Sequence, residues 1–356
     1  MTVGIVGMGL IGGSLARRLV DRGVKVVAWN HRPHPYAEAE RAGIHCVPTL
    51  TALVETEPDV IVLCNPLKAM PAILAELKPL LDAAPDIILT DVGSVKGMVR
   101  DQVEAAGLGN RYVGAHPMAG NELSGWTAAD PALYDDALWA ITVTSDTEFD
   151  RFLTVARLIV DGVGNRVIVL DDDTHDKAAA MISHMPHVVA TALINELTAD
   201  PNRNIAAALA AGSWRDMTRV ALTDPDRTRA MVEEDAANVE GLLRDMAARL
   251  NAVADLLRDE RTAAASEVAS DPQVAAMQRF FAEGQPFRDY KARQRAIASQ
   301  GGGTDGTSGE LAYEERLVDF TPEHWQTDLL ASARRGEHII ALAGPRTVRV
   351  QLRSAL

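Results

Sequence analysis

Two short motifs follow apolar, strand-like runs directly. Each motif carries a side chain that can donate or accept a proton. "GAHPMAG" (114–120) carries His116, and "DVGSVKG" (91–97) carries Ser94. If both runs are strands of one parallel sheet, their carboxyl ends meet at one edge, and Ser94 and His116 converge on one crevice. A histidine titrates near neutrality and can accept a proton from a substrate hydroxyl. Structural roles are the alternative to catalytic ones. His116 can fill space in the fold, and Ser94 can cap a helix that begins near Val95.

Further along the chain, a second group of residues is suited to binding a charged substrate. "DDDTHDKAAAMISHMPH" contains His184 and His187 on one helix face, with Pro186 between them expected to kink the helix. We expect no metal site, because further ligands at suitable spacing are missing, and one of the two histidines can equally fill the core. "GSWRDMTRVA" offers Arg215 and Arg219, four residues apart on one helical face, for bidentate binding of carboxylates or for plain surface solvation.

A glycine-rich loop at the start of the chain predicts a dinucleotide site. "GIVGMGLIGGS" holds Gly7, Gly9 and Gly12 in the G-x-G-x-x-G spacing, with Leu10 and Ile11 between the last two glycines. The loop closes an expected strand and opens an expected helix, which is the context that the motif requires. Gly7 would permit the tight turn, Gly9 the approach of a pyrophosphate and Gly12 close packing, while the helix N–H groups face the phosphates. A tight turn without a ligand is the alternative.

The end of the second expected strand bears on which nicotinamide cofactor is used. In NAD-binding loops, an acidic residue about twenty positions after the glycines binds the ribose hydroxyls and repels the extra phosphate of NADP. Here "WNHRP" has Asn30 at that place and Arg32 two residues on. The sequence therefore predicts a preference for NADP, with NAD usable. In the alternative, Asn30 binds the ribose of NAD and Arg32 points into solvent.

The elements that position these residues fall into an α/β half and an all-α half. Because apolar runs alternate with helical stretches, the first half predicts a doubly wound, mostly parallel sheet of Rossmann type. After Thr174 the strands stop, and apolar residues recur every three or four positions to about Glu260. The wide apolar stripes predict a homodimer through the helical domain, with intrachain packing as the alternative. The expected strands cover 3–7, 24–29, 59–64, 86–92, 111–115, 138–144 and 166–170.

A glycine-rich stretch over 299–309 reads as a flexible linker to a small tail. The tail shows a strand, helix, strand, strand pattern whose role is open. We therefore expect a nucleotide-binding domain over 1–170, a helical substrate and dimerisation domain over 171–298, and a small α/β appendage over 310–356.

Composition limits the possible partners and location of the protein. The chain has 356 residues, 47% of them hydrophobic, and a formal net charge of −14, which disfavours binding to nucleic acid and anionic membranes. No apolar run approaches the roughly 18 to 20 residues of a membrane span. Because a secretory signal is not apparent and Cys46 and Cys64 form no disulfide framework, the expected location is the cytoplasm.

The ordered motifs resemble those of the prephenate and arogenate dehydrogenases of tyrosine biosynthesis. The resemblance covers about residues 1–260, and the tail does not resemble the regulatory ACT domain that some relatives carry. It implies a nucleotide domain, a helical dimerisation domain, an active site in the cleft between them, and oxidative decarboxylation of a cyclohexadienol to a phenol.

The same resemblance implies roles for individual residues. His116 would be the catalytic histidine and Ser94 its partner at the ring hydroxyl, while His187 would lie on the substrate side and Arg219 would bind a carboxylate. Arg215 ranks after Arg219 as a carboxylate ligand, because the family pattern has a variable polar residue at its position.

These observations predict NAD(P)-dependent oxidation of prephenate to 4-hydroxyphenylpyruvate and carbon dioxide. Arogenate, which carries an amino group in place of the keto group, is distinguished by no residue that we can place. A 3-hydroxyacid dehydrogenase is an alternative function, which the "GAHPMAG" and "SHMPH" motifs disfavour. A non-catalytic nucleotide sensor is another, but it would have no use for Ser94, His116 and Arg219.

Overall fold

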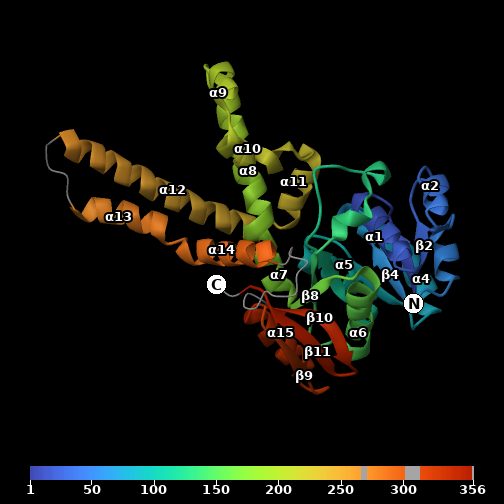
Figure 1. Ribbon diagram of the computed structural model, residues 1–356. Helices are drawn as coiled ribbons and strands as arrows, with labels where there is room; N and C mark the ends of the chain where they lie inside the picture. Colours follow the sequence, from blue (N-terminus) through green and yellow to red (C-terminus); the bar gives the residue numbers. More distant parts are fainter. Residues whose placement is uncertain (266–270, 301–312, 355–356) are drawn as a thin grey trace.

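The computed structural model describes residues 1–265, 271–300 and 313–354 (Figure 1). Its N-terminal half is built on a five-stranded, fully parallel sheet in the order β3-β2-β1-β4-β5. The chain order reverses between β1 and β4, and a ligand crevice is expected where the strands end at such a switch point. The strands are β1 (Thr2–Val6), β2 (Lys25–Trp29), β3 (His45–Cys46), β4 (Val60–Leu63) and β5 (Ile88–Asp91).

Helices cover both faces of this sheet, which explains why its strands are mostly apolar. One face packs against α1 (Leu10–Asp21) and α2 (Tyr36–Arg41). The other face packs against α3 (Leu50–Val54), α4 (Met70–Asp82) and α5 (Lys96–Ala105). The predicted Rossmann-type fold is confirmed.

A second sheet continues from β5 through a single bridge between Leu89 and Tyr112. It begins with β6 (Gly114–Pro117), β7 (Leu138–Thr142) and β8 (Arg166–Leu170), and β6 runs antiparallel to β7. The expected strand over 111–115 is therefore placed too early. Arg111 ends a short 3-10 turn, where its buried guanidinium donates to the carbonyls of Ala84 and Ile87. As a result, His116 lies inside β6 and not behind the strand.

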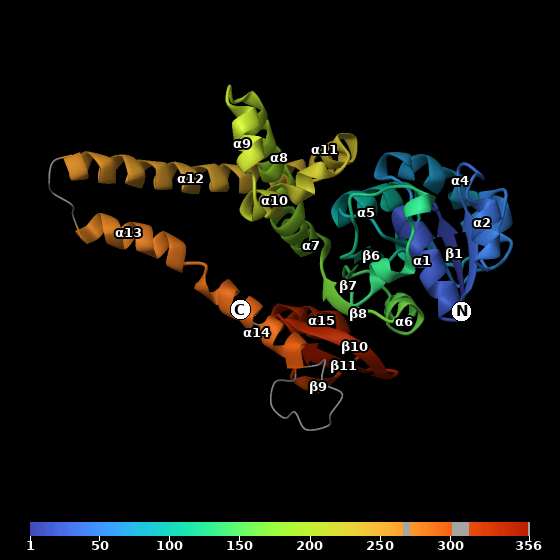
Figure 2. The ribbon, with the colours of Figure 1, turned by 45° about the horizontal axis from the view of Figure 1, so that its top comes forward.

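The tail adds three strands to this second sheet. β10 (Glu337–Gly344) pairs antiparallel with β8, giving the order β6-β7-β8-β10-β11-β9 (Figures 1 and 2). Helix α15 (Trp325–Arg334) stacks Trp325 on Phe152 of α6 (Phe149–Arg157), with ring centroids 4.8 Å apart. The tail thus shares the core of the nucleotide-binding half. The other two strands are β9 (Glu315–Asp319) and β11 (Thr347–Leu352). The expected linker over 299–309 begins inside α14, and its residues after 300 lie outside the described part of the chain.

The remaining helices form the second half, as predicted. In both views α12 and α13 lie side by side and project away from the body (Figures 1 and 2). Pro186 is the second residue of α8, where a missing N–H is tolerated, and the irregularity in the backbone is a π-helical turn (Ala180–His184) just before α8. Within the described residues, we find no helix with the length and hydrophobicity that crossing a bilayer requires. The helices are α7 (Asp172–Ala179), α8 (Met185–Ala199), α9 (Arg203–Leu209), α10 (Gly212–Thr218), α11 (Pro225–Glu234), α12 (Ala236–Ala265), α13 (Asp271–Ala282) and α14 (Gln285–Gln300).

Candidate active site

One cavity of about 450 Å³ gathers most of the predicted substrate-side residues. Ser94, His116, His187 and Arg219 all line it, although they come from four separate segments of the chain. Arg215 does not line it. The physical reason is that α10 ends at Thr218 and a tighter turn (Arg219–Leu222) follows, so the two arginines do not share one continuous helical face.

His116 lines this cavity with a neutral imidazole. Burial lowers the pKa of His116 well below its usual value, and the neighbouring His175, Lys96 and His184 lower it further. At neutral pH the imidazole is therefore unprotonated and able to accept a proton.

A buried ion pair supports the strand that carries His116. Asp91, at the end of β5, pairs with Lys96, and both side chains are fully buried. The Lys96 ammonium also donates to the carbonyl of Ala115 at 2.8 Å, and Asp91 accepts from the Tyr112 hydroxyl at 2.8 Å. The carboxylate is thus well satisfied and ties β5 to β6. Sequence reasoning missed Lys96, although it stands within "DVGSVKG".

Two further residues missed by sequence reasoning, His175 and Asp176, lie next to the catalytic candidate. The His116 Nδ1 is 2.9 Å from the His175 Nε2, and the His175 Nδ1 is 2.8 Å from an Asp176 carboxylate oxygen. Both residues lie on α7, the first helix of the helical half. The adjacent "HD" within "THDKAAAMISHMPH" was the available signal, but nothing local in the sequence connects it to β6.

Asp176 also explains how the start of α5 is capped. Its carboxylate accepts the backbone N–H groups of Lys96 at 2.7 Å and Gly97 at 2.9 Å. The N-cap position of α5 is Val95, which makes no side-chain cap. The interpretation of Ser94 as the helix cap is therefore wrong, and its hydroxyl is left to the cavity.

His184 and His187 have separate environments. The His184 Nδ1 lies 2.9 Å from an Asp235 oxygen, and both side chains are buried, so His184 is a core residue. The His187 Nδ1 donates to the Ser183 carbonyl at 2.9 Å. Because its Nδ1 is used in this way, His187 can offer its Nε2 to a ligand in the cavity.

The cavity is also lined by an arginine that the sequence did not single out. Arg227 of α11 lines the cavity and donates to the carbonyls of Leu123 at 2.8 Å and Asn121 at 2.7 Å. It thereby ties the loop after β6 to the helical half.

The glycine loop has the geometry that a dinucleotide needs. Gly7 has φ of 103° and donates to the Trp29 carbonyl at 2.8 Å. A Cβ on Gly12 would lie 2.1 Å from the Gly7 carbonyl oxygen, so only glycine fits there. A Cβ on Gly9 would meet nothing within 4 Å, which leaves open space directly before the first residue of α1, Leu10. A pyrophosphate fits at this helix start.

At the end of β2, Asn30 is bonded within the protein. Its Oδ1 accepts the Met8 N–H at 2.8 Å, and its Nδ2 donates to the Arg32 carbonyl at 2.8 Å. The Arg32 side chain is exposed, and within the described residues it makes no ion pair. The end of β2 therefore carries a neutral amide at position 30 and an exposed cation at position 32.

Comparison with known families decides which one the chain belongs to. The nucleotide-binding domain of prephenate dehydrogenase matches residues 15–169, and the dimerization domain of the same enzyme matches residues 171–269. The chain belongs to the prephenate dehydrogenase family. The first match begins after the glycine loop.

Relatives of this family agree along most of the chain. A cyclohexadienyl dehydrogenase of Zymomonas mobilis is 30% identical over 240 residues, covering 66% of this chain and 80% of the relative. A prephenate dehydrogenase of Lactococcus lactis is 28% identical over 235 residues, covering 62% of this chain, and the chain spans only 61% of the length of that relative. Among solved structures, prephenate dehydrogenase from A. aeolicus in complex with hydroxyphenyl propionate and NAD+ has a TM-score of 0.69 at 29% identity, covering 80% of this chain and 97% of that one.

Proposed function

We propose that the protein is an NAD(P)-dependent dehydrogenase that converts prephenate to 4-hydroxyphenylpyruvate and carbon dioxide. The observation that carries the proposal is the single cavity in which a neutral histidine, His116, faces the same space as Ser94, His187 and Arg219. Membership of the prephenate dehydrogenase family, together with a glycine loop open to a pyrophosphate, supports it.

Each residue has one task in this reaction. His116 takes the proton of the ring hydroxyl, so that the O–H bond breaks and an N–H bond forms, and Ser94 hydrogen-bonds the same hydroxyl. A nicotinamide cofactor held at the glycine loop would supply the acceptor for the hydride of the carbinol carbon. The ring carboxylate departs as carbon dioxide, and its bonding electrons complete the aromatic ring. The ring oxygen then takes the proton back from His116, which gives the phenol and restores the neutral imidazole. Arg219 and the His187 Nε2 hold carboxylate groups of the dianion in place.

The test is a steady-state assay of the purified protein with prephenate, following reduced cofactor and released carbon dioxide together. We expect equal amounts of both products. Arogenate is the second candidate substrate, because the Zymomonas mobilis relative is named for cyclohexadienyl substrates as a class. A panel of prephenate, arogenate and a β-hydroxyacid separates the alternatives, and oxidation of the β-hydroxyacid alone would overturn the proposal.

For the cofactor, we propose that NADP is favoured and that NAD is usable. The support is the neutral Asn30, already bonded to Met8 and Arg32, and the exposed guanidinium of Arg32 beside it, which pairs with no described residue. An arginine at this edge can pair with a 2′-phosphate. Arg32→Ala should lower the ratio of kcat/KM for NADP over NAD by about tenfold or more, as expected for loss of one charge-assisted contact.

The matched control for Arg32 is Arg41→Ala. Arg41 is an exposed arginine of α2 whose guanidinium donates to its own helix, so its loss should leave the cofactor ratio unchanged. A wild-type protein that favours NAD, or an unchanged ratio in Arg32→Ala, would refute the proposed preference.

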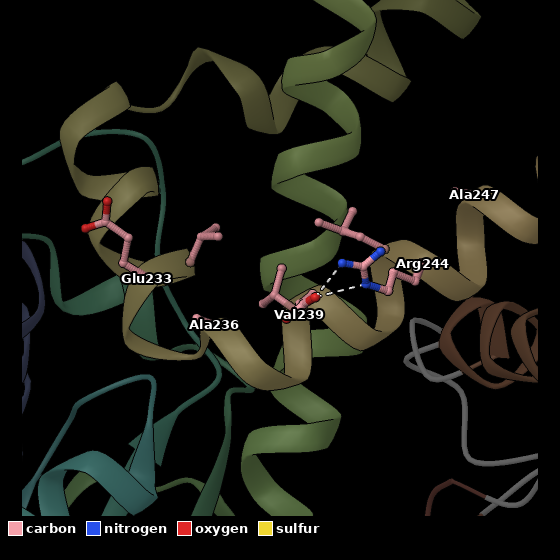
Figure 3. Close-up of a pocket in the computed structure, with 8 residues that line it drawn as sticks. Glu233, Ala236, Val239, Arg244 and Ala247 are labelled. Carbon is pink, nitrogen blue, oxygen red and sulfur yellow. Dashed lines mark hydrogen bonds and ion pairs between the residues drawn. The ribbon is translucent and has the colours of Figure 1, made fainter.

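We also propose a homodimer formed through the helical half. Leu209 is 76% exposed and Leu222 is 73% exposed, both within the matched dimerization domain. The face of α11 and α12 has an apolar hollow of about 440 Å³ beside the Glu240–Arg244 ion pair (Figure 3). Light scattering should report a dimer that Leu209→Glu weakens. Leu317→Glu, at a 58% exposed leucine of the tail, is the control and should leave the dimer intact.

The proposed location is the cytoplasm, on the ground that Cys46 and Cys64 are free thiols.

A further inference from the structure

His116 is the first member of a hydrogen-bonded chain that ends on a carboxylate. Its Nδ1 meets the His175 Nε2 at 2.9 Å, and the His175 Nδ1 meets Asp176 at 2.8 Å. The two rings stand edge to face, with centroids 5.1 Å apart and planes at 69°. His175 is 2% exposed and Asp176 is 7% exposed, so water has little access to the hydrogen bonds between His116, His175 and Asp176.

The carboxylate end determines the direction of the hydrogen bonds. Burial alone would raise the pKa of Asp176, but hydrogen bonds from His175 and from the N–H groups of Lys96 and Gly97 outweigh it and lower the pKa below its usual value. An ionised carboxylate only accepts hydrogen bonds, so the His175 Nδ1 must carry a proton and donate it. With a single proton on the ring, the His175 Nε2 is an acceptor. The His116 Nδ1 then carries a proton too, which leaves the lone pair of His116 on Nε2.

We infer that His175 and Asp176 are positioning residues that hold His116 in the tautomer whose Nε2 accepts the substrate proton. The inference rests on the proposed function, in which His116 is the base. When His116 gains its proton it becomes an imidazolium, whose Nδ1–H continues to donate to His175. The carboxylate of Asp176 at the far end stabilises that buried positive charge.

Asp176 also caps α5, so a merely structural role must be separated from the positioning role. One Asp176 oxygen serves both His175 and the Lys96 N–H, and the other serves the Gly97 N–H. In Asp176→Asn, the amide oxygen retains part of the cap of α5. An NH₂ group turned toward His175 donates to its Nδ1, so the hydrogen bonds from residue 176 to His175 and on to His116 reverse their donor-to-acceptor direction. His116 would then carry its proton on Nε2, which is the unreactive tautomer.

Four variants test the inference. In His175→Phe and Asp176→Asn, kcat should fall by roughly 100- to 10,000-fold, the range for loss of a correctly set base, with KM nearly unchanged. His175→Gln can accept from the His116 Nδ1–H through its amide oxygen, so it should recover much of the kcat lost in His175→Phe. Asp172→Asn is the matched control, because Asp172 lies on the same helix and pairs with Arg100, away from this chain. Asp172→Asn should lower the melting temperature about as much as Asp176→Asn does, but it should leave kcat unchanged.

A direct measurement of the tautomer is independent of turnover. In protein labelled with ¹⁵N-histidine, the ring-nitrogen shifts of His116 should identify a protonated Nδ1 and an unprotonated Nε2, and Asp176→Asn should reverse them. His116→Asn identifies the signal among the nine histidines. A wild-type His116 protonated at Nε2, or full kcat in both His175→Phe and Asp176→Asn, would overturn the inference. Absence of prephenate turnover with the expected tautomer would instead overturn the proposed function alone.

Discussion

Arg219 should bind a carboxylate of the substrate, whereas Arg215 should not. The chain carries a net charge of −14, so a dianionic substrate needs a fixed cation at its site. Arg219 lines the cavity and Arg215 does not. A charge-assisted hydrogen bond contributes about 1.5 to 3 kcal/mol. The Arg219 side chain is exposed, so solvent screening places its effect at the low end of that range. About 1.5 kcal/mol corresponds to a roughly tenfold change in KM.

The assay measures initial rates against prephenate concentration with the cofactor saturating. Arg219→Ala should raise KM about tenfold and leave kcat nearly unchanged, because the contact exists both before and during the reaction. The difference from wild type should shrink at high ionic strength, as expected for an exposed charge. Arg215→Ala, four residues away, is the matched control and should leave KM unchanged. An unaltered KM in Arg219→Ala, or an equal rise in Arg215→Ala, would refute this assignment.

Three further predictions concern the base and its support. His116→Asn should reduce kcat by about 100- to 10,000-fold while cofactor affinity, measured by calorimetry, stays the same; retention of most turnover would make His116 structural. Burial lowers the pKa of His116, and the unprotonated form is the active one. The value of kcat/KM should therefore stay level through neutral pH and fall only well below pH 6.5. A pH profile in which kcat/KM falls at or above pH 6.5 would contradict the mechanism. Lys96→Met leaves the buried Asp91 without its cation and should lower the free energy of unfolding in urea by about 3 to 5 kcal/mol, whereas a loss under about 1 kcal/mol would show that the pair is not charged.

Much of the fold could be predicted because the burial of a segment is reflected in the residue types of that segment. Strands covered by helices on both faces are apolar at most positions, and the glycine loop is specific because Gly12 tolerates no Cβ. The direction of β6 left no such trace, since an antiparallel strand has the same side-chain alternation as a parallel one. The pairing of β10 with β8 was equally hidden, because strand partners far apart in sequence are chosen by packing.

The substrate-side residues were predictable to the extent that motifs place them at strand ends and on helices. Ser94 was the ambiguous case, because a serine before a helix is usually its cap. The cap in fact comes from Asp176, about eighty residues later, and no local pattern records that contact. His175 was missed for a similar reason, since its meaning depends on α7 packing beside β6.

The base site is therefore a joint product of both halves of the chain. His116 belongs to the nucleotide-binding half, but the groups that set its proton belong to the first helix of the helical half. The same helix is also joined to α5, because Asp176 caps the α5 start. Arg227, which also lines the cavity, binds the loop after β6. The relative placement of the two halves thus determines both the shape of the cavity and the nitrogen at which His116 accepts a proton.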